Sequence, residues 1–211
     1  VELAARSPAD FDVVTFRGSG EPTLARNLGA VMGWVRANLP RPVVVLTNGT
    51  LLGDRAVQQD LALADIVALK LDAVSSDHWQ TINRPAPELH LENVLQGMLA
   101  FRATYLGYVA VQTMVMTPWS KAEEQRYQAL IQALRPHEVQ LNTPLRSRPL
   151  TRQLEARGNV TTPDPTWRQP RHVTPATLNA MAMRLQAQLD LPVRHPYQDA
   201  PPPCSTAAEV A

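Results

Sequence analysis

The 211-residue chain has little cysteine and little lysine. Its single cysteine, Cys204, excludes an internal disulfide and any metal site built from several cysteines of this chain. Lysine occurs only as Lys70 and Lys121, so 18 of the 20 basic side chains are arginine. This arginine excess, together with 19 prolines, indicates a bias in genomic base composition. The formal net charge of +1 provides no strong field toward nucleic acid or an acidic membrane.

Long apolar runs are also missing. No run approaches the length of a membrane span, and no signal peptide is visible, so we expect a cytoplasmic protein with no membrane partner. The chain begins at Val1 rather than at methionine, and we expect this N-terminus to be a cut end. With 45% hydrophobic and 18% charged residues, the composition is that of a globular domain with a proper core.

Several common functional motifs are absent. The segment "GSGEPT" (18–23) lacks the Gly-Lys-Ser/Thr of a phosphate-binding loop and the third glycine of a dinucleotide fingerprint. The five histidines show no metal-ligand spacing, so a zinc site is not expected. No Gly-x-Ser-x-Gly elbow of a serine hydrolase is present.

The chain does contain apolar runs of strand length that alternate with helix-like stretches. The expected strands, rich in Val, Ile and Leu, are 12–16, 42–47, 65–71, 108–116 and 138–142. The expected helices are 24–39, 54–63, 90–105, 120–134 and 176–191. Ser120 and Glu123 form a capping box, and Thr174 with Pro175 begins the last helix. Such alternation predicts an α/β fold in which parallel strands form an incomplete (β/α) barrel.

The composition and periodicity of the sequence change after residue 143. Residues 143–175 are rich in proline and arginine without clear periodicity, and the tail from Pro192 has the composition of a loose segment. We therefore expect a partial barrel over residues 1–150. An irregular extension over 151–211, with one helix at about 175–191, would follow it.

Each expected strand ends in polar or glycine-rich residues, at 17–22, 47–50, 70–72, 116–118 and 140–143. In parallel α/β folds the chemistry gathers at this edge of the sheet. The period of two places Lys70 and Asp72 on one face, and likewise Gln140 and Asn142, which indicates a lined cavity rather than a packed core. Other interpretations stay open: Asn48-Gly49 is a common turn, Lys70 and Asp72 can neutralise each other, and strand ends are often merely solvated.

Five segments in order resemble the radical S-adenosylmethionine (radical SAM) superfamily. More narrowly, they resemble the iron–sulfur oxidoreductases related to the tRNA wyosine-forming enzymes. "SGEPTL" (19–24) is similar to the family's Gly-Gly-Glu-Pro motif. It is followed by "VVVLTNGTLL" (43–52), "ADIVALKLDAVSSDHWQTINRP" (64–85), "LENVLQGMLAFRATYLGYVAVQTMVM" (91–116) and "EVQLNTPLRSRP" (138–149). The resemblance covers residues 10 to 150, and several motifs in order are more specific than one.

The resemblance implies two cofactors, SAM and a [4Fe–4S] cluster. In the family the Gly-Glu-Pro loop surrounds the amino group of SAM's methionine, which assigns Gly18, Gly20 and Glu21 to that end of the ligand. Glycines suit the role because they permit close approach of the backbone.

The same resemblance assigns Thr47, Asn48 and Asp72 to the adenosine and ribose, with Asp72 accepting hydrogen bonds from ribose hydroxyls. Arg146 would pair with SAM's carboxylate, or would be an ordinary surface arginine.

One family motif is missing. The Cys-x-x-x-Cys-x-x-Cys that holds the cluster lies after the family's first barrel strand, and Cys204 alone cannot replace it. We expect the cluster ligands upstream of Val1, so that the chain lacks the first βα unit and strand 12–16 becomes an edge. The intact order of the other motifs favours such a truncation over a degenerate, non-catalytic barrel.

The resemblance also implies the activity and partners of the parent protein. It would cleave SAM reductively at the cluster and abstract hydrogen from an unknown substrate, with electrons from a low-potential donor such as flavodoxin or ferredoxin. One candidate substrate is tRNA, because Trp167 lies among arginines that could contact phosphates, namely Arg146, Arg148, Arg152, Arg157, Arg168 and Arg171. An arginine-rich, solvated linker is the favoured alternative, given the near-neutral total charge.

Overall fold

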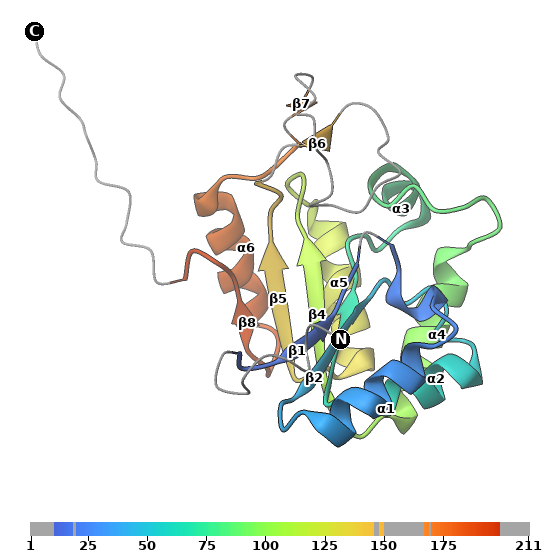
Figure 1. Ribbon diagram of the computed structural model, residues 1–211. Helices are drawn as coiled ribbons and strands as arrows, with labels where there is room; N and C mark the ends of the chain where they lie inside the picture. The colour runs from blue at the N-terminus through green and yellow to red at the C-terminus, as the bar shows by residue number, and fades with distance from the viewer. Residues whose placement is uncertain (1–10, 19, 146–147, 150–166, 169, 199–211) are drawn as a thin grey trace, which may run out of the picture.

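The computed structural model describes residues 11–18, 20–145, 148–149, 167–168 and 170–198. Its centre is a six-stranded parallel sheet with the strand order β1-β2-β3-β4-β5-β8 (Figure 1). The strands are β1 (Val14–Phe16), β2 (Val43–Thr47), β3 (Ile66–Lys70), β4 (Tyr108–Met114), β5 (Glu138–Asn142) and β8 (Val193–Arg194). A separate antiparallel pair joins β6 (Arg148–Pro149) to β7 (Trp167–Arg168).

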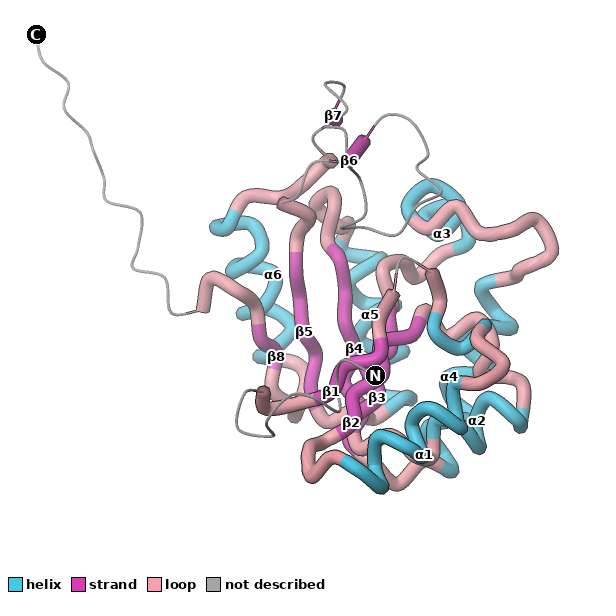
Figure 2. The backbone as a smooth tube through the Cα atoms, in the orientation of Figure 1, coloured by secondary structure: helices cyan, strands magenta, loops and turns pink. Residues whose placement is uncertain are grey.

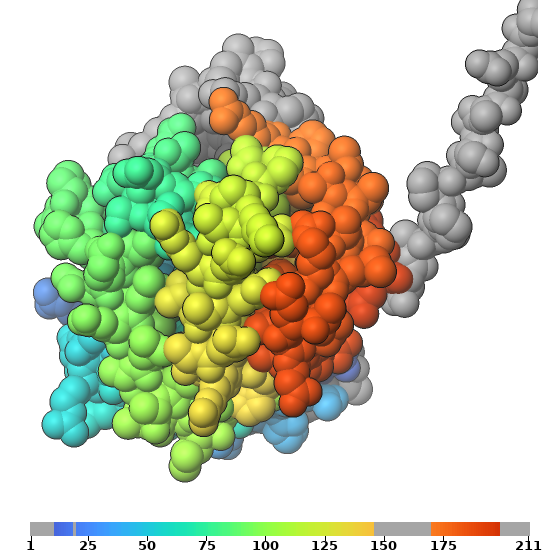
Figure 3. Space-filling view, turned by 180° about the vertical axis from the view of Figure 1, so that it is seen from behind, coloured from blue at the N-terminus to red at the C-terminus, as the bar shows by residue number. Residues whose placement is uncertain are grey.

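Helices surround the outside of the curved sheet, as Figure 2 shows. They are α1 (Leu28–Asn38), α2 (Arg55–Leu61), α3 (Ser76–Ile82), α4 (Leu91–Thr104), α5 (Lys121–Leu134) and α6 (Pro175–Gln186), with a 3-10 turn η3 (Pro22–Leu24) before α1. Seen from behind in Figure 3, the green, yellow and orange segments that contain α4, α5 and α6 lie side by side. No helix among the described residues is long and apolar enough to cross a membrane.

The hydrophobic core lies between the sheet and these helices. Every second residue of a strand faces it, for example Val67 and Leu69 of β3 and Val109 and Val111 of β4, all fully buried. Ala68 is also buried but lies outside that core cluster, because its side chain is on the opposite face of β3. The sheet therefore has one apolar, helix-covered face and one face that is free to carry other side chains.

The α/β fold class with a partial barrel of parallel strands is confirmed, and so is the position of β1 at the edge of the sheet. The capping box of Ser120 and Glu123 is present, and Thr174 caps α6 with Pro175 in its first turn. The helix expected at 24–39 begins only at Leu28, because Leu24 belongs to the separate turn η3, which Glu21 caps.

Two expectations were wrong, and one helix was missed. We expected a loose tail from Pro192, but Val193–Arg194 forms β8, whose register with β5 is fixed by Val139 opposite Val193. The last helix ends at Gln186 rather than near residue 191. Helix α3 was not expected, because Trp79 is its one buried residue and it shows no apolar stripe.

The division of the chain near residue 150 stays a prediction, since much of 146–169 lies outside the described residues. The loose end expected beyond residue 198 lies outside them as well.

Candidate functional site

Glu21 connects the loop after β1 to the end of β2. Its Oε1 accepts hydrogen bonds from the backbone nitrogen and hydroxyl of Thr23, at 3.2 and 2.8 Å, and from Thr47 Oγ1 at 2.6 Å. Its Oε2 accepts a bond from the backbone nitrogen of Asn48 at 2.8 Å. One carboxylate thus serves as the cap of η3 and as a crosslink between two strand-end loops.

The loop after β2 is a tight turn ordered by its own side chains. Asn48 Oδ1 accepts hydrogen bonds from the backbone nitrogen and hydroxyl of Thr50, at 3.0 and 2.8 Å. Gly49 has φ 77°, and a Cβ placed on it would lie 2.4 Å from Met98 Cε of α4. The backbone angle therefore favours glycine, and any side chain added here would displace the end of Met98.

Asp72 is the buried carboxylate at the end of β3, with 1% of its side chain exposed. Its Oδ2 pairs with Lys70 and accepts a hydrogen bond from Asn83 Nδ2 at 3.1 Å. Its Oδ1 accepts a hydrogen bond from the backbone nitrogen of Met114 at 2.9 Å, which ties β3 to β4. Lys70 and Asp72 do neutralise each other, and Lys70 keeps 45% of its side chain exposed.

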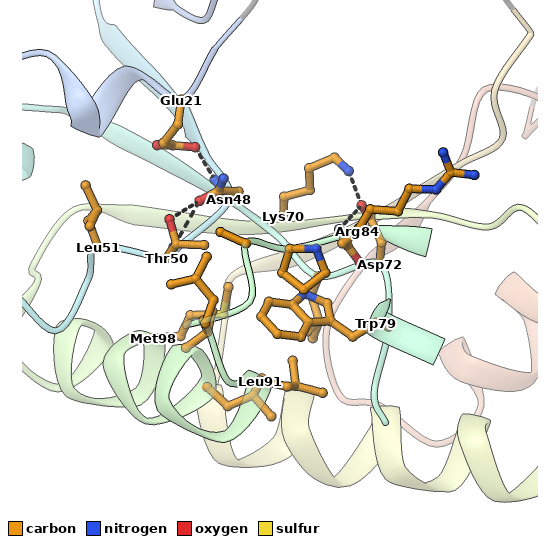
Figure 4. A pocket seen from close by; sticks show the side chains of 18 of the residues that line it. Glu21, Asn48, Thr50, Leu51, Lys70, Asp72, Trp79, Arg84, Leu91 and Met98 are labelled. Carbon is orange, nitrogen blue, oxygen red and sulfur yellow. Dashed lines mark hydrogen bonds and ion pairs between the residues drawn. The ribbon is translucent and has the colours of Figure 1, made fainter. Parts of the chain in front are cut away.

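A cavity of about 460 Å³ lies where these loops meet (Figure 4). Its polar side chains come from the loops after β1, β2 and β3 and from the segment after α3: Glu21, Asn48, Thr50, Lys70, Asp72, Asn83, Arg84 and Glu88. Its apolar wall includes Leu51, Trp79, Leu91 and Met98. Figure 4 shows Trp79, Leu91 and Met98 below the polar group and Leu51 to its left. An apolar wall with a few convergent polar groups is typical of a small-molecule site.

The cavity brings together some of the residues singled out in the sequence. Glu21, Asn48 and Asp72 line it, and Thr47 lies buried beside it with 3% of its surface exposed. Gly18 and Gly20 are not among the lining residues. Arg146 lies outside the described residues.

Sequence reasoning missed Trp79, Asn83 and Arg84. Arg84 has φ 48° although it is not glycine, and such residues are uncommon. The proline that follows disfavours the ordinary helical region at this position, so the dipeptide "RP" was the signal that could have drawn attention here. Asn83 could not be placed because α3, which it ends, was not expected.

An iron–sulfur cluster does not fit the residues of this chain. Among the described residues no group of three His, Cys, Asp or Glu side chains could hold a metal ion. Cys204, the one thiol of the chain, lies outside those residues and cannot by itself supply the thiolates of a cluster.

Comparison with known proteins gives both sequence relatives and a shared fold. A UPF0026 protein of Synechocystis is 43% identical over 196 residues, which are 92% of this chain and 74% of that protein. The GTP 3′,8-cyclase of Mycobacterium ulcerans is 36% identical over 112 residues, covering 53% of this chain and 30% of the cyclase. No family model matches the chain.

A solved structure has the same fold at low sequence identity. It is a domain of the pyruvate-formate lyase-activating enzyme from Bacteroides vulgatus, with a TM-score of 0.58 and 13% identity over 88% of this chain and 99% of that domain. Together with the cyclase, this match defines the chain as a radical SAM-like partial barrel. The chain belongs to the UPF0026 family. The narrower resemblance to tRNA wyosine-forming enzymes finds no support in these comparisons and stays a prediction.

Proposed function

We propose that the chain is the SAM-binding part of a radical SAM enzyme. The main support is the position of the cavity, which lies at the carboxyl edge of the first three strands in a radical SAM-like barrel. Ligands of parallel α/β folds bind at this edge. The relation to GTP 3′,8-cyclase supports an enzymatic parent family.

The chemistry of the cavity suits a ligand with a planar apolar part and a charged end. Its volume of about 460 Å³ is within the range of ordinary ligand sites. The wall of Trp79, Leu51 and Met98 would take the adenine, and the polar side would take the ribose and the amino acid. Lys70 donates one hydrogen bond to Asp72 and keeps further N–H groups for SAM's carboxylate. This role for Lys70 stands beside the one predicted for Arg146.

Asp72 has limited capacity left for a ribose. A carboxylate offers about four acceptor positions. Lys70, Asn83 and the Met114 backbone use three of them. In this proposal Asp72 accepts one ribose hydroxyl at most, and its main work is to orient Lys70 and Asn83.

Glu21 has a similar positioning role in the proposal. Both of its oxygens bind the protein, so it shapes the loop. In this proposal the backbone at Gly18 and Gly20, outside the lining of the cavity, would contact the methionine part of SAM. Thr47 and Asn48 hold the neighbouring loop in place for the adenosine.

The cluster ligands would be cysteines before Val1, since the chain itself cannot provide them. SAM and the cluster together would supply reductive cleavage of SAM and hydrogen abstraction from a substrate, with flavodoxin or ferredoxin as the electron donor. The contribution of this chain is to bind, orient and exclude water. A barrel that binds no SAM at all would be the degenerate scaffold instead.

A second candidate is the RNA-modifying version of the same enzyme, with tRNA as substrate. It is favoured by the antiparallel pairing that sets Arg148 opposite Arg168, beside Trp167. Filter binding of tRNA at increasing salt, with wild type and the double variant Arg148→Gln/Arg168→Gln, tests it. Binding that is unchanged in the variant would remove this candidate.

Calorimetric titration with SAM tests the main proposal on the full-length gene product. We expect Lys70→Met to weaken SAM binding about tenfold, by the loss of a charge-assisted hydrogen bond. Arg126→Met, on the exposed side of α5, is the control and should bind SAM as the wild type does. Anaerobic reconstitution should then show a [4Fe–4S] signal and formation of 5′-deoxyadenosine. A folded protein without SAM affinity would overturn the proposal.

A further inference from the structure

A row of polar side chains crosses four neighbouring strands of the sheet. The strand registers place Lys70 of β3 opposite Gln112 of β4, Gln112 opposite Gln140 of β5, and Gln140 opposite Arg194 of β8. These four residues, the polar row, lie on the face opposite the hydrophobic core, and two of them, Lys70 and Gln112, follow Ala68 and Ala110 by two positions on the same face. Both alanines are buried, so the side chains next to Lys70 and Gln112 on this face of β3 and β4 are small.

Three members of the polar row, Gln112, Gln140 and Arg194, are linked by hydrogen bonds through Glu138, whereas Lys70 pairs separately with Asp72. Gln112 Nε2 donates to Gln140 Oε1 at 2.8 Å, and Gln140 Nε2 donates to Glu138 Oε1. Arg194 Nε donates to the other oxygen of Glu138 at 2.9 Å. Glu138 is buried, with 12% of its side chain exposed. The network is partly buried, and its hydrogen bonds hold the amide groups of both glutamines in one direction.

The charges of the row compensate each other in pairs. Lys70 is neutralised by Asp72 at one end, and Arg194 by Glu138 at the other. The two residues in the middle, Gln112 and Gln140, are uncharged. The row therefore offers no net positive field to a phosphate or another anion. What it offers instead is hydrogen bonding.

Gln112 provides the free hydrogen-bonding groups. Its amide nitrogen uses one N–H on Gln140 and has a second, and its Oε1 accepts no hydrogen bond within the described residues. That oxygen is not fully buried, although Gln112 itself does not line the cavity at the end of β3. A carboxamide with one free acceptor and one free donor can form two hydrogen bonds at once with a group that presents a donor next to an acceptor. Nucleobases present such edges, and glutamine amides bind them this way.

We propose that the polar row, with Gln112 at its centre, binds the hydrogen-bonding edge of an uncharged nucleobase. This inference rests on the proposed function, because it names the substrate class of that enzyme. The fixed direction of the Gln112 amide gives selectivity among bases. The neutral row admits a base and gives no added affinity for a phosphate.

The test is a titration of the full-length protein with guanosine, cytidine and uridine, followed by saturation-transfer NMR. Adenosine is left out because SAM carries the same base. We expect at least one nucleoside to bind and ribose 5-phosphate not to bind. Gln112→Leu should weaken nucleoside binding about tenfold, as the loss of a two-point base contact does. The matched control is Gln125→Leu on the exposed surface of α5, which should bind as the wild type does.

A second variant guards against misfolding of the first. Gln112→Glu keeps the size of the side chain and removes its N–H donors, so it should also lose nucleoside binding while its circular dichroism stays that of the wild type. The inference is overturned if ribose 5-phosphate binds as well as the nucleosides. It is overturned too if both folded Gln112 variants bind normally, or if a protein that binds SAM binds no nucleoside. Loss of SAM binding alone would instead count against the proposed function.

Discussion

The two edges of the sheet use the same chemistry to different ends. At the carboxyl edge, Glu21 and Asp72 hold the strand-end loops around a cavity. At the amino edge, Asp65 Oδ2 accepts a hydrogen bond from the backbone nitrogen of Val43 at 2.8 Å, and its Oδ1 pairs with Arg36 at 2.9 Å. Asp65 lines no part of the cavity. A carboxylate that orders loops is therefore not by itself a sign of a binding site, and the space above it makes the difference.

The largest effect is expected at Asp72. Asp72→Ala leaves the Lys70 ammonium, the Asn83 amide and the Met114 nitrogen without their acceptor. We expect the free energy of unfolding to fall by about 3 kcal/mol, less than for a fully buried pair because Lys70 is half exposed. Urea denaturation measures it. Asp190→Ala, an exposed residue, should change stability by less than about 0.5 kcal/mol, and equal losses in the two variants would contradict the role given to Asp72.

A smaller loss of stability is expected for a substitution at Glu21, and a substitution at Gly20 serves as its comparison. Glu21→Ala removes the crosslink to Thr47 and Asn48 and should cost about 2 kcal/mol in urea denaturation. Among the described residues no atom lies within 4 Å of the position that a Cβ on Gly20 would take. Gly20→Val should therefore leave the unfolding free energy nearly unchanged while weakening SAM binding. If Gly20→Val keeps full SAM affinity, this loop is a turn and nothing more.

The close approach of α4 to the loop after β2 gives the next prediction. Gly49→Ala places a methyl group against Met98 at a residue with φ 77°, and should cost about 1–2 kcal/mol. Gly53→Ala is the control, because no described atom lies within 4 Å of its added Cβ. In thermal unfolding of the two variants, only Gly49→Ala should have a lower midpoint than the wild type.

The smallest effect is expected at Asp65 and depends on pH. Burial raises the pKa of Asp65, but the hydrogen bond from Val43 and the Arg36 guanidinium outweigh it and hold the pKa below its ordinary value. A lowered folded-state pKa stabilises the fold above the ordinary value, and that stability is lost as the pH falls through the lower one. The difference in unfolding free energy between wild type and Asp65→Asn should thus shrink from pH about 5 to about 2. If the difference in unfolding free energy stays the same over this pH range, the pKa of Asp65 is not lowered in the folded state.

Much of the sheet was predictable because buried parallel strands are continuous apolar runs. The run "VVVLT" became β2, and the expected alternation with helices placed Glu21, Asn48 and Asp72 at one edge, where they do line a cavity. The pattern could not predict whether a polar side chain binds a ligand or another part of the protein. The acceptors of Asp72 are mostly taken by groups distant in sequence, such as the backbone of Met114.

Two parts of the fold were beyond sequence patterns for a different reason. Strand β8 has two residues, too few to show a period of two, and its place is set by pairing with β5. The side chain of Asn83 reaches Asp72 because of how α3 ends. Both depend on tertiary contacts that no local pattern encodes.

The position of β8 has a consequence for how the sheet assembles. Strands β1 to β4 each pair with the next strand along the chain, whereas Val139 of β5 lies opposite Val193 of β8, more than fifty residues later in the sequence. Closing a loop of this length costs conformational entropy, and only two residue pairs of β5 and β8 form in return. Native-state hydrogen exchange should accordingly be faster at the Val139 amide, which donates to Pro192, than at Val111 in the middle of the sheet. We therefore expect the pairing of β5 with β8 to open more readily than the centre of the sheet.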